Sequence, residues 1–254
     1  MTRRAAPPDV VILCGGRGLR LRPVLGVRPK VLADIGGRPF LRLLVDRLMG
    51  RGFHRFIFCT GIGSKQIERY WTVAGPVRAE AQLTFSREER PLGTAGAVRY
   101  ARPKIRTDPF LVINGDSICD LDYRRLIEFH RKTAARVTVA LAPAGLAGGS
   151  PRRDGGNVRL DRTSAISQFE EKKSGGSVRY INAGVYVFQR SVLDQIPPGK
   201  ASSLEKELFP NLIGKGLYGF PGRVPLFDIG TPERLRAFRN LFLRRKRVRA
   251  SGKP

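Results

Sequence analysis

The run VVILCGGRGLRLRP, residues 10–23, decides the fold of this chain. It opens with five apolar residues, of which Val10, Val11 and Ile12 are β-branched, as in a central strand that is buried on both faces. Gly15, Gly16 and Gly18 then let the main chain pass close to a phosphate and point its N–H groups at it. A buried strand followed by such a turn predicts an α/β fold with a ligand at the strand's carboxyl end.

The glycine turn matches neither of two common phosphate-binding fingerprints. The dinucleotide motif requires a third glycine where Leu21 stands, and no Gly-Lys-Ser/Thr closes the loop as in a Walker motif. A glycine turn with arginines remains, followed by Pro29-Lys30. Arg20 can bind a phosphate through two parallel hydrogen bonds, whereas Lys30 acts as a point charge. The alternative interpretation is a plain glycine turn with exposed arginines.

Strand and helix patterns alternate through the first part of the chain. After the opening strand, we expect strands at 55–60, about 77–85, 110–113 and 137–141, and helices at 39–49, 64–71, 94–101 and 123–132. This alternation predicts a Rossmann-like α/β fold, with a mixed, mostly parallel sheet flanked by helices. Later come a hairpin at 157–160 and 165–169, a long strand at 180–188, and helices at 202–213 and 232–243. We therefore predict one domain, residues 1–243, with a small β-rich subregion and a disordered basic tail at 244–254.

The charge of the chain is unusual. Against 21 acidic residues stand 47 basic ones, which gives a net charge of +26. The basic residues are spread along the chain, apart from 3–4 and 244–249, and no aromatic motif for stacking bases accompanies them. We interpret this as a solvated, arginine-rich surface that would attract a phosphorylated small substrate. The alternative is a nucleic-acid-associated or regulatory binding protein that keeps the fold without catalysis.

The cysteine content and the lack of long apolar runs indicate the cellular compartment of the protein. Cys14, Cys59 and Cys119 are odd in number, widely spaced and placed in or after apolar runs, which predicts buried thiols in a reducing compartment. With only two histidines, a His-centred triad or a zinc site is not expected. No apolar run is long enough for a transmembrane helix, and no apolar leader opens the chain. These features predict a cytoplasmic protein.

Aspartates follow two of the expected strands. Asp116 lies just past the strand at 110–113, where open α/β sheets bind ligands. A carboxylate there suits Mg²⁺, which takes one or two protein carboxylates, several waters and substrate phosphates. Asp228 follows residues 226–227, and neighbouring strand ends could bring the two aspartates together. A turn or helix-capping role is the alternative, above all for Asp228, which precedes a helix start at 231–233.

Three further groups are candidates for contacts with a ligand. Glu171 and Lys172 could hold a sugar hydroxyl and a phosphate, although a solvated charge run is the simpler interpretation. Asn182 stands in an apolar strand and needs hydrogen-bond partners from the protein or from a polar ligand. Gly93 and Thr94 belong to a tight turn that a base or sugar could approach, unless the turn serves only helix packing.

Together these motifs resemble the sugar-1-phosphate nucleotidyltransferases over about residues 10–243. The matching segments, in chain order, are Gly15–Leu21, Pro29-Lys30, Gly37-Arg38-Pro39, Leu92–Gly96, Gly115-Asp116, Phe169–Lys172, Asn182–Tyr186 and Asp228–Pro232. Within that family the resemblance is greatest to D-glycero-α-D-manno-heptose 1-phosphate guanylyltransferases. Mannose-1-phosphate guanylyltransferases and N-acetylmuramate-1-phosphate uridylyltransferases share much of the pattern.

The resemblance implies a reaction and its participants. A nucleotidyl group, GMP from GTP above all, would pass to a sugar 1-phosphate, such as a heptose 1-phosphate, by Mg²⁺-dependent in-line displacement. Residues 9–140 would serve the nucleotide and residues 150–243 the sugar phosphate. The partners implied are these small molecules, with no specific nucleic acid and no membrane, and a homo-oligomer is compatible with the resemblance.

The resemblance also assigns site residues. These are Leu13, Gly15, Gly16, Gly18, Gly93 and Thr94 for the nucleotide; Arg20, Lys30 and Asp116 for catalysis; Asn114, Glu171, Lys172 and Asn182 for the sugar phosphate; and Asp116 and Asp228 for Mg²⁺. The chain departs from the family pattern at Leu19, where many members carry a hydroxyl, and at Val31, where many carry proline.

Overall fold

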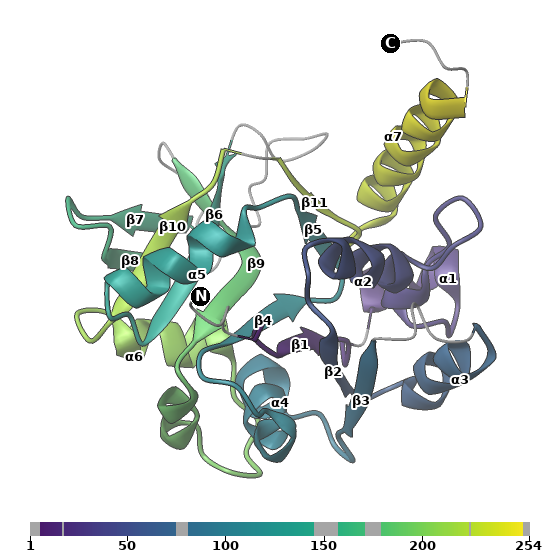
Figure 1. The fold of residues 1–254 in the computed structure, drawn as a ribbon. Coiled ribbons are helices and arrows are strands. Elements are labelled where there is room, and N and C mark those ends of the chain that lie inside the picture. Colours follow the sequence, from purple (N-terminus) through teal and green to yellow (C-terminus); the bar gives the residue numbers. More distant parts are fainter. Residues whose placement is uncertain are drawn as a thin grey trace.

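The computed structural model describes residues 6–16, 18–74, 81–144, 157–170, 179–223 and 225–250, with side chains as far as Arg244. Its main sheet has the strand order β10-β6-β9-β4-β1-β2-β3 (Figure 1). The bounds of these strands are β1 Val10–Leu13, β2 Arg55–Thr60, β3 Gln82–Arg87, β4 Phe110–Asn114, β6 Val137–Pro143, β9 Tyr180–Phe188 and β10 Leu217–Pro221. The hairpin β7 (Asn157–Leu160) and β8 (Ile166–Glu170) extends the sheet from β9, and β5 (Ser117–Cys119) pairs with β11 (Leu226–Asp228).

The sheet is mixed and mostly parallel, as predicted. β1 runs parallel to β2 and β4, β2 runs parallel to β3, and β10 runs parallel to β6. β9 runs antiparallel to both β4 and β6 and joins the two halves of the sheet. The predicted α/β fold class is confirmed.

Helices cover both faces of the sheet. Their bounds are α1 Arg22–Leu25, α2 Phe40–Gly50, α3 Ser64–Ala74, α4 Gly93–Tyr100, α5 Tyr123–Lys132, α6 Phe209–Leu212 and α7 Pro232–Ala250. Short helical turns lie between them, at η1 Leu19–Leu21, η2 Lys30–Leu32, η3 Arg102–Lys104, η5 Arg190–Gln195 and η6 Leu204–Leu208.

Each strand contributes to two hydrophobic cores because its side chains alternate between the faces. Val10 and Ile12 pack with residues of α2, α3, α5 and α7 on one face. Val11 packs with residues of α4 and α6 on the other. This burial on both sides explains the unbroken apolar run that opens the chain. The three cysteines are free and buried, which confirms the prediction of buried thiols.

The structure corrects several predicted boundaries. The strand expected at 77–85 is β3 at 82–87, while 75–80 lie outside the described residues. The helix expected at 202–213 begins instead at Leu204 with a π-helical turn, which Ser203 caps by accepting from the N–H groups of Glu205 and Lys206. β5 and β10 were not predicted. Both are short and carry little sequence pattern of their own.

The end of the chain also differs from the prediction. α7 does not end at Leu243 but continues to Ala250, because the arginine-rich run after Leu243 contains no glycine or proline to end a helix. The predicted disordered tail is therefore helical as far as Ala250. Residues 145–156 and 251–254 lie outside the described residues. In the described part of the chain, no helix is both long and apolar enough to cross a membrane.

Candidate active site

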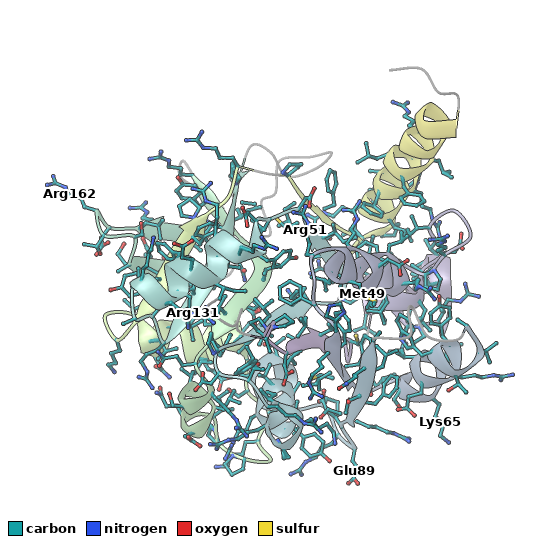
Figure 2. All side chains as sticks on the ribbon, viewed as in Figure 1. Met49, Arg51, Lys65, Glu89, Arg131 and Arg162 are labelled. Atoms are coloured by element: carbon teal, nitrogen blue, oxygen red, sulfur yellow. The ribbon has the colours of Figure 1, made fainter. Side chains whose placement is uncertain are left out.

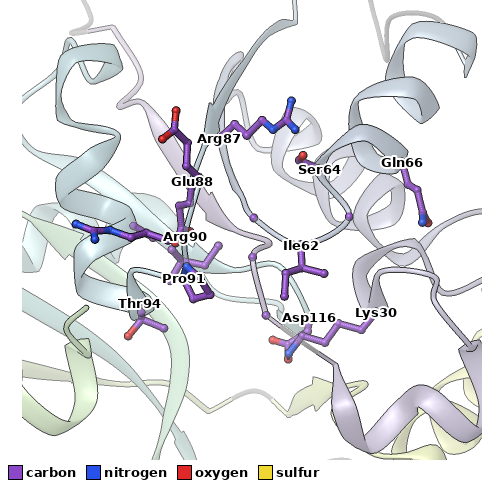
Figure 3. A pocket seen from close by; sticks show the side chains of 18 of the residues that line it. Lys30, Ile62, Ser64, Gln66, Arg87, Glu88, Arg90, Pro91, Thr94 and Asp116 are labelled. Atoms are coloured by element: carbon purple, nitrogen blue, oxygen red, sulfur yellow. The ribbon is translucent and has the colours of Figure 1, made fainter. Parts of the chain in front are cut away.

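A cleft of about 970 Å³ opens where the parallel strands end (Figure 3). Leu13, Arg87 and Asn114, the last residues of β1, β3 and β4, line it, and Gly61 follows the end of β2. This is the edge at which open α/β sheets bind ligands. The predicted site residues Gly15, Gly16, Lys30, Gly93, Thr94 and Asp116 line the same cleft.

Lys30 and Asp116 meet in this cleft. Lys30 Nζ lies 2.5 Å from Asp116 Oδ2, and the Ser117 hydroxyl donates to Oδ1 at 3.2 Å. Burial alone would raise the pKa of Asp116, but the charge and hydrogen bond of Lys30, aided by Ser117, lower it below its ordinary value. Asp116 is therefore ionised at neutral pH, and the pair puts one positive and one negative group side by side.

The glycine turn lies directly over Lys30. A Cβ atom at Gly16 would lie 3.3 Å from Lys30 Cε, so a larger residue would require the lysine side chain to shift by a few tenths of an ångström. Gly18 has φ +59°, a left-handed backbone that side chains disfavour. The main chain of the turn therefore lies close to the Lys30 side chain, while its close approach to a phosphate stays a prediction. Arg17 lies outside the described residues.

The opposite wall of the cleft comes mostly from residues that the sequence did not single out, apart from Pro91 and Ala97, which belong to the predicted tight turn. These wall residues follow β2, begin α3, end or follow β3, or lie in α4. They are Gly61, Ile62, Gly63, Ser64, Lys65, Gln66, Arg87, Glu88, Glu89, Arg90, Pro91 and Ala97. Glu88 Oε2 accepts from Leu92 N at 2.7 Å. Burial raises the pKa of Glu88, and the Leu92 hydrogen bond opposes that rise. A correct boundary for β3 would have revealed Glu88 as the first residue after a strand.

Gly93 and Thr94 begin α4 at one side of the cleft. Gly93 has φ +71°, and a Cβ there would lie 2.4 Å from Ser202 O. Thr94 Oγ1 accepts from Leu204 N at 2.8 Å and donates to Glu205 Oε2 at 2.9 Å. Close packing of this turn against the segment before η6 thus fixes Thr94, as the packing interpretation expects. The turn also lines the cleft, and its contact with a base or sugar stays a prediction.

Asn114 and Asn182 stand on neighbouring strands. β4 pairs with β9, and a Cβ at Gly184 would lie 2.7 Å from Asn114 Nδ2. Asn182 accepts from Gly184 N and donates to Tyr186 Oη, both at 2.9 Å. The partners that a polar residue in an apolar strand requires therefore come from the protein. Asn182 is not among the described residues that line the cleft.

The remaining predicted residues are less closely gathered. Arg20 is exposed in η1, and neither it nor Asp228 is among the described residues that line the cleft. Glu171 and Lys172 lie outside the described residues. Leu19 is 56% exposed, whereas Val31 is fully buried in the core, so the two departures from the family pattern fill ordinary surface and interior positions.

Asp228 is adjacent to Asp116 through the main chain. It pairs with Ser117 between β11 and β5, and Ile229 N donates to Asp116 O at 3.1 Å. The Asp228 carboxylate accepts from Gly230 N at 2.7 Å and contacts Arg234 Nη1 at 3.4 Å. The expected meeting of two strand ends is present, and so is the turn-forming role that was the alternative.

The donor chemistry of this corner fits Mg²⁺. Asp116 and Asp228 would supply hard oxygen ligands from neighbouring main-chain positions, and the cleft beside Asp116 has room for phosphate and water. The described residues contain no cluster of three or more His, Cys, Asp or Glu side chains suited to a metal. A cation here would therefore take most of its ligands from water and substrate.

Comparison with known proteins supplies the family. The profile described as nucleotidyl transferase matches residues 9–243. A mannose-1-phosphate guanylyltransferase of Mycobacterium tuberculosis is 36% identical over 228 residues, which cover 89% of this chain and 62% of that protein. A mannose-1-phosphate guanylyltransferase catalytic subunit beta of Drosophila melanogaster is 32% identical, with coverage of 96% and 65%.

A solved structure is similar to this chain in both fold and sequence. The crystal structure of HddC from Yersinia pseudotuberculosis complexed with GMP-PN has a TM-score of 0.78 and 29% identity, covering 93% of this chain and 100% of that chain. The chain spans a little under two thirds of the length of the two mannose-1-phosphate relatives. Since the family profile matches nearly the whole sequence, from the opening strand into α7, the chain belongs to the nucleotidyl transferase family.

Proposed function

We propose that this protein transfers GMP from GTP to a sugar 1-phosphate of the manno configuration, releasing pyrophosphate. The observation that carries the proposal is the Lys30–Asp116 pair, inside a cleft at the carboxyl edge of the sheet, in a chain of this family. Mannose 1-phosphate is supported by the names of the relatives. Heptose 1-phosphate, whose ring has the same configuration, is supported by the sequence resemblance.

The reaction needs no protein nucleophile. A phosphate oxygen of the sugar 1-phosphate forms a bond to the α-phosphorus of GTP, and the bond from that phosphorus to pyrophosphate breaks. Positioning and stabilisation of charge then account for most of the catalysis. Lys30 would bind the phosphates near the reacting phosphorus, and the Gly15-Gly16 turn would offer main-chain N–H groups. Arg20 would approach the departing pyrophosphate from η1.

Asp116 and Asp228 would hold Mg²⁺. When bound, the ion would offset the negative charge of the phosphate oxygens. The depressed pKa of Asp116 keeps its carboxylate charged and available for this role. Asn114 and Asn182, which stand on the paired strands β4 and β9, would contact the sugar phosphate. The family resemblance gives the same role to Glu171 and Lys172.

Glu88 supports guanine as the base. An ionised carboxylate only accepts hydrogen bonds, and the Watson–Crick edge of guanine carries two adjacent donors, N1–H and the 2-amino group. Glu88 Oε2 accepts a hydrogen bond from Leu92 N, whereas Glu88 Oε1 lies near Gly15 inside the cleft. Uracil offers a single donor between two carbonyl groups, so the uridylyltransferase alternative fits this wall less well.

A matrix of nucleoside triphosphates against sugar 1-phosphates, with Mg²⁺, tests the proposal through pyrophosphate release. We expect the highest kcat/KM for GTP with α-D-mannose 1-phosphate or D-glycero-α-D-manno-heptose 1-phosphate. The acceptor with the higher kcat/KM identifies which of the two sugars is the substrate. Absence of pyrophosphate release with every pair, from a folded protein, would contradict the proposal.

A further inference from the structure

A chain of hydrogen bonds joins Thr94 to Asn182 through two residues that have no role so far. Asn182 Nδ2 donates to Tyr186 Oη at 2.9 Å, and Tyr186 Oη donates to Glu205 Oε1 at 3.2 Å. On the other carboxylate oxygen, Thr94 Oγ1 donates at 2.9 Å and Ser203 Oγ at 3.1 Å. Glu205 therefore stands between the start of α4 and strand β9.

The direction of every bond in this network is fixed. Tyr186 Oη accepts from Asn182, Thr94 Oγ1 accepts from Leu204 N, and Ser203 Oγ accepts from the N–H groups of Glu205 and Lys206. Each hydroxyl proton is therefore left for the Glu205 carboxylate, which can only accept. Because Asn182 Oδ1 accepts from Gly184 N, the orientation of the Asn182 amide is fixed as well.

The surroundings make the network rigid. Tyr186 is fully buried, and its ring packs against Phe209 and Phe188 with centroids 5.2 and 6.3 Å apart. Glu205 lies in the π-helical turn η6, where Glu207 N and Leu208 N both donate to Ser203 O, at 3.2 and 3.1 Å. Such turns are rare and occur frequently at functional sites.

We infer that Glu205 is a positioning residue for the transfer reaction. It holds Thr94, on the nucleotide side, and Asn182, on the sugar-phosphate side, in one rigid frame. In-line displacement needs the two substrates at a fixed separation, and this frame sets the separation of the groups that bind them. The inference rests on the proposed function, which gives Thr94 and Asn182 their substrates.

Three variants separate positioning from general stability. Tyr186→Phe keeps the buried ring and cuts only the branch to Asn182, so the KM for the sugar 1-phosphate should rise about tenfold while that for GTP stays within about twofold. Glu205→Gln disturbs both branches, and both KM values should rise. The double variant should bind the sugar phosphate no worse than Glu205→Gln alone, because the two changes affect one bonded chain.

Glu207→Gln is the matched control in the same turn. Glu207 accepts from Ser202 Oγ at 3.0 Å and from Ser203 N at 3.1 Å, and it is exposed. We expect neither KM to change in this variant. If Glu205→Gln does not fold, the inference is tested by Tyr186→Phe alone, through the difference between its KM for the sugar 1-phosphate and its KM for GTP.

The outcomes distinguish this inference from the proposed function. A selective rise in the sugar-phosphate KM in Tyr186→Phe supports the inference. Equal changes in both KM values in Tyr186→Phe, or unchanged KM values in folded Glu205→Gln, would overturn the inference and leave the proposed function standing. A wild-type protein without pyrophosphate release would overturn both.

Discussion

Glu88 and Glu89 are neighbours in sequence but differ in their surroundings. Glu88 is half-buried in the wall of the cleft, where Leu92 N fixes one of its oxygens. Glu89 also lines the cleft, but it is exposed and its side chain extends from the surface of the molecule (Figure 2). The two carboxylates therefore offer a matched pair for testing how the base is chosen.

We predict that Glu88→Gln weakens the preference for GTP. The amide keeps one acceptor but loses the charge and presents a donor towards the donors of guanine. The ratio of kcat/KM for GTP to that for UTP should fall roughly 10- to 100-fold, the worth of one or two charged hydrogen bonds. Glu89→Gln should leave the ratio unchanged. An unchanged ratio in Glu88→Gln would remove Glu88 from base recognition.

His130 illustrates a residue whose role concerns stability rather than the site. It is 2% exposed, and its Nδ1 lies 2.9 Å from Thr138 Oγ1. Burial lowers the pKa of His130 from 6.5 to about 4. The negative charge of Asp108 opposes this shift, and the positive charge of Arg131 adds a smaller decrease. The native state therefore favours the neutral ring.

This pKa predicts a pH dependence of folding. Above about pH 6.5 the ring is neutral in both the folded and the unfolded state, so its full contribution to stability is present. As the pH falls to about 4 the unfolded state binds the proton first, and roughly 3 kcal/mol of stability is lost. Urea unfolding of wild type and His130→Gln at several pH values measures this loss. The gap between the two proteins should narrow as the pH falls, and a constant gap would refute the assignment.

At the scale of elements, the bounds of a strand or helix could be predicted where its own residues show a clear hydrophobic pattern. β2, α5 and β9 have the predicted bounds because each has a strong pattern of its own. Asp122 also marks the start of α5. β5, β10 and the π-helical turn depend on partners distant in the sequence. The Asp116–Asp228 proximity could be predicted from two strand ends, whereas the Glu205 network could not, since it needs three distant segments to meet.

The cap of α5 allows a prediction for a single element. Asp122 accepts from the N–H groups of Arg124 and Arg125, both at 3.1 Å. Asp122→Ala should lower the free energy of unfolding by about 1 kcal/mol and leave kcat/KM unchanged. Glu128→Ala removes only an exposed ion pair with Lys132 in the same helix, and should cost less. Chemical denaturation compares the two, and an equal or larger loss in Glu128→Ala would contradict the capping role.

At the scale of the molecule, α7 carries part of the large positive charge away from the body. Its first turns pack through Leu235 and Phe238 onto the core, and Arg239 Nε donates to Asp34 O at 2.8 Å. The far end projects beyond the sheet and the other helices (Figure 1). With a net charge of +26, the whole surface would attract any polyanion.

We predict that binding to nucleic acid is non-specific and separable from catalysis. Affinity for a short DNA duplex should fall at least about 100-fold between about 50 and about 200 mM salt, as counterion release requires. Deletion of residues after Leu243 should weaken this binding and leave pyrophosphate release intact. Titrations at both salt concentrations measure the effect. Affinity that persists at high salt would favour the nucleic-acid-associated alternative.

The central claim is that the cleft holding Lys30 and Asp116 carries out nucleotidyl transfer. Pyrophosphate release by Asp116→Ala, with GTP, a manno-configured sugar 1-phosphate and Mg²⁺, tests it most directly. We predict a loss of at least about 100-fold in kcat, with unchanged far-ultraviolet circular dichroism. Turnover close to that of the wild-type protein would contradict the claim.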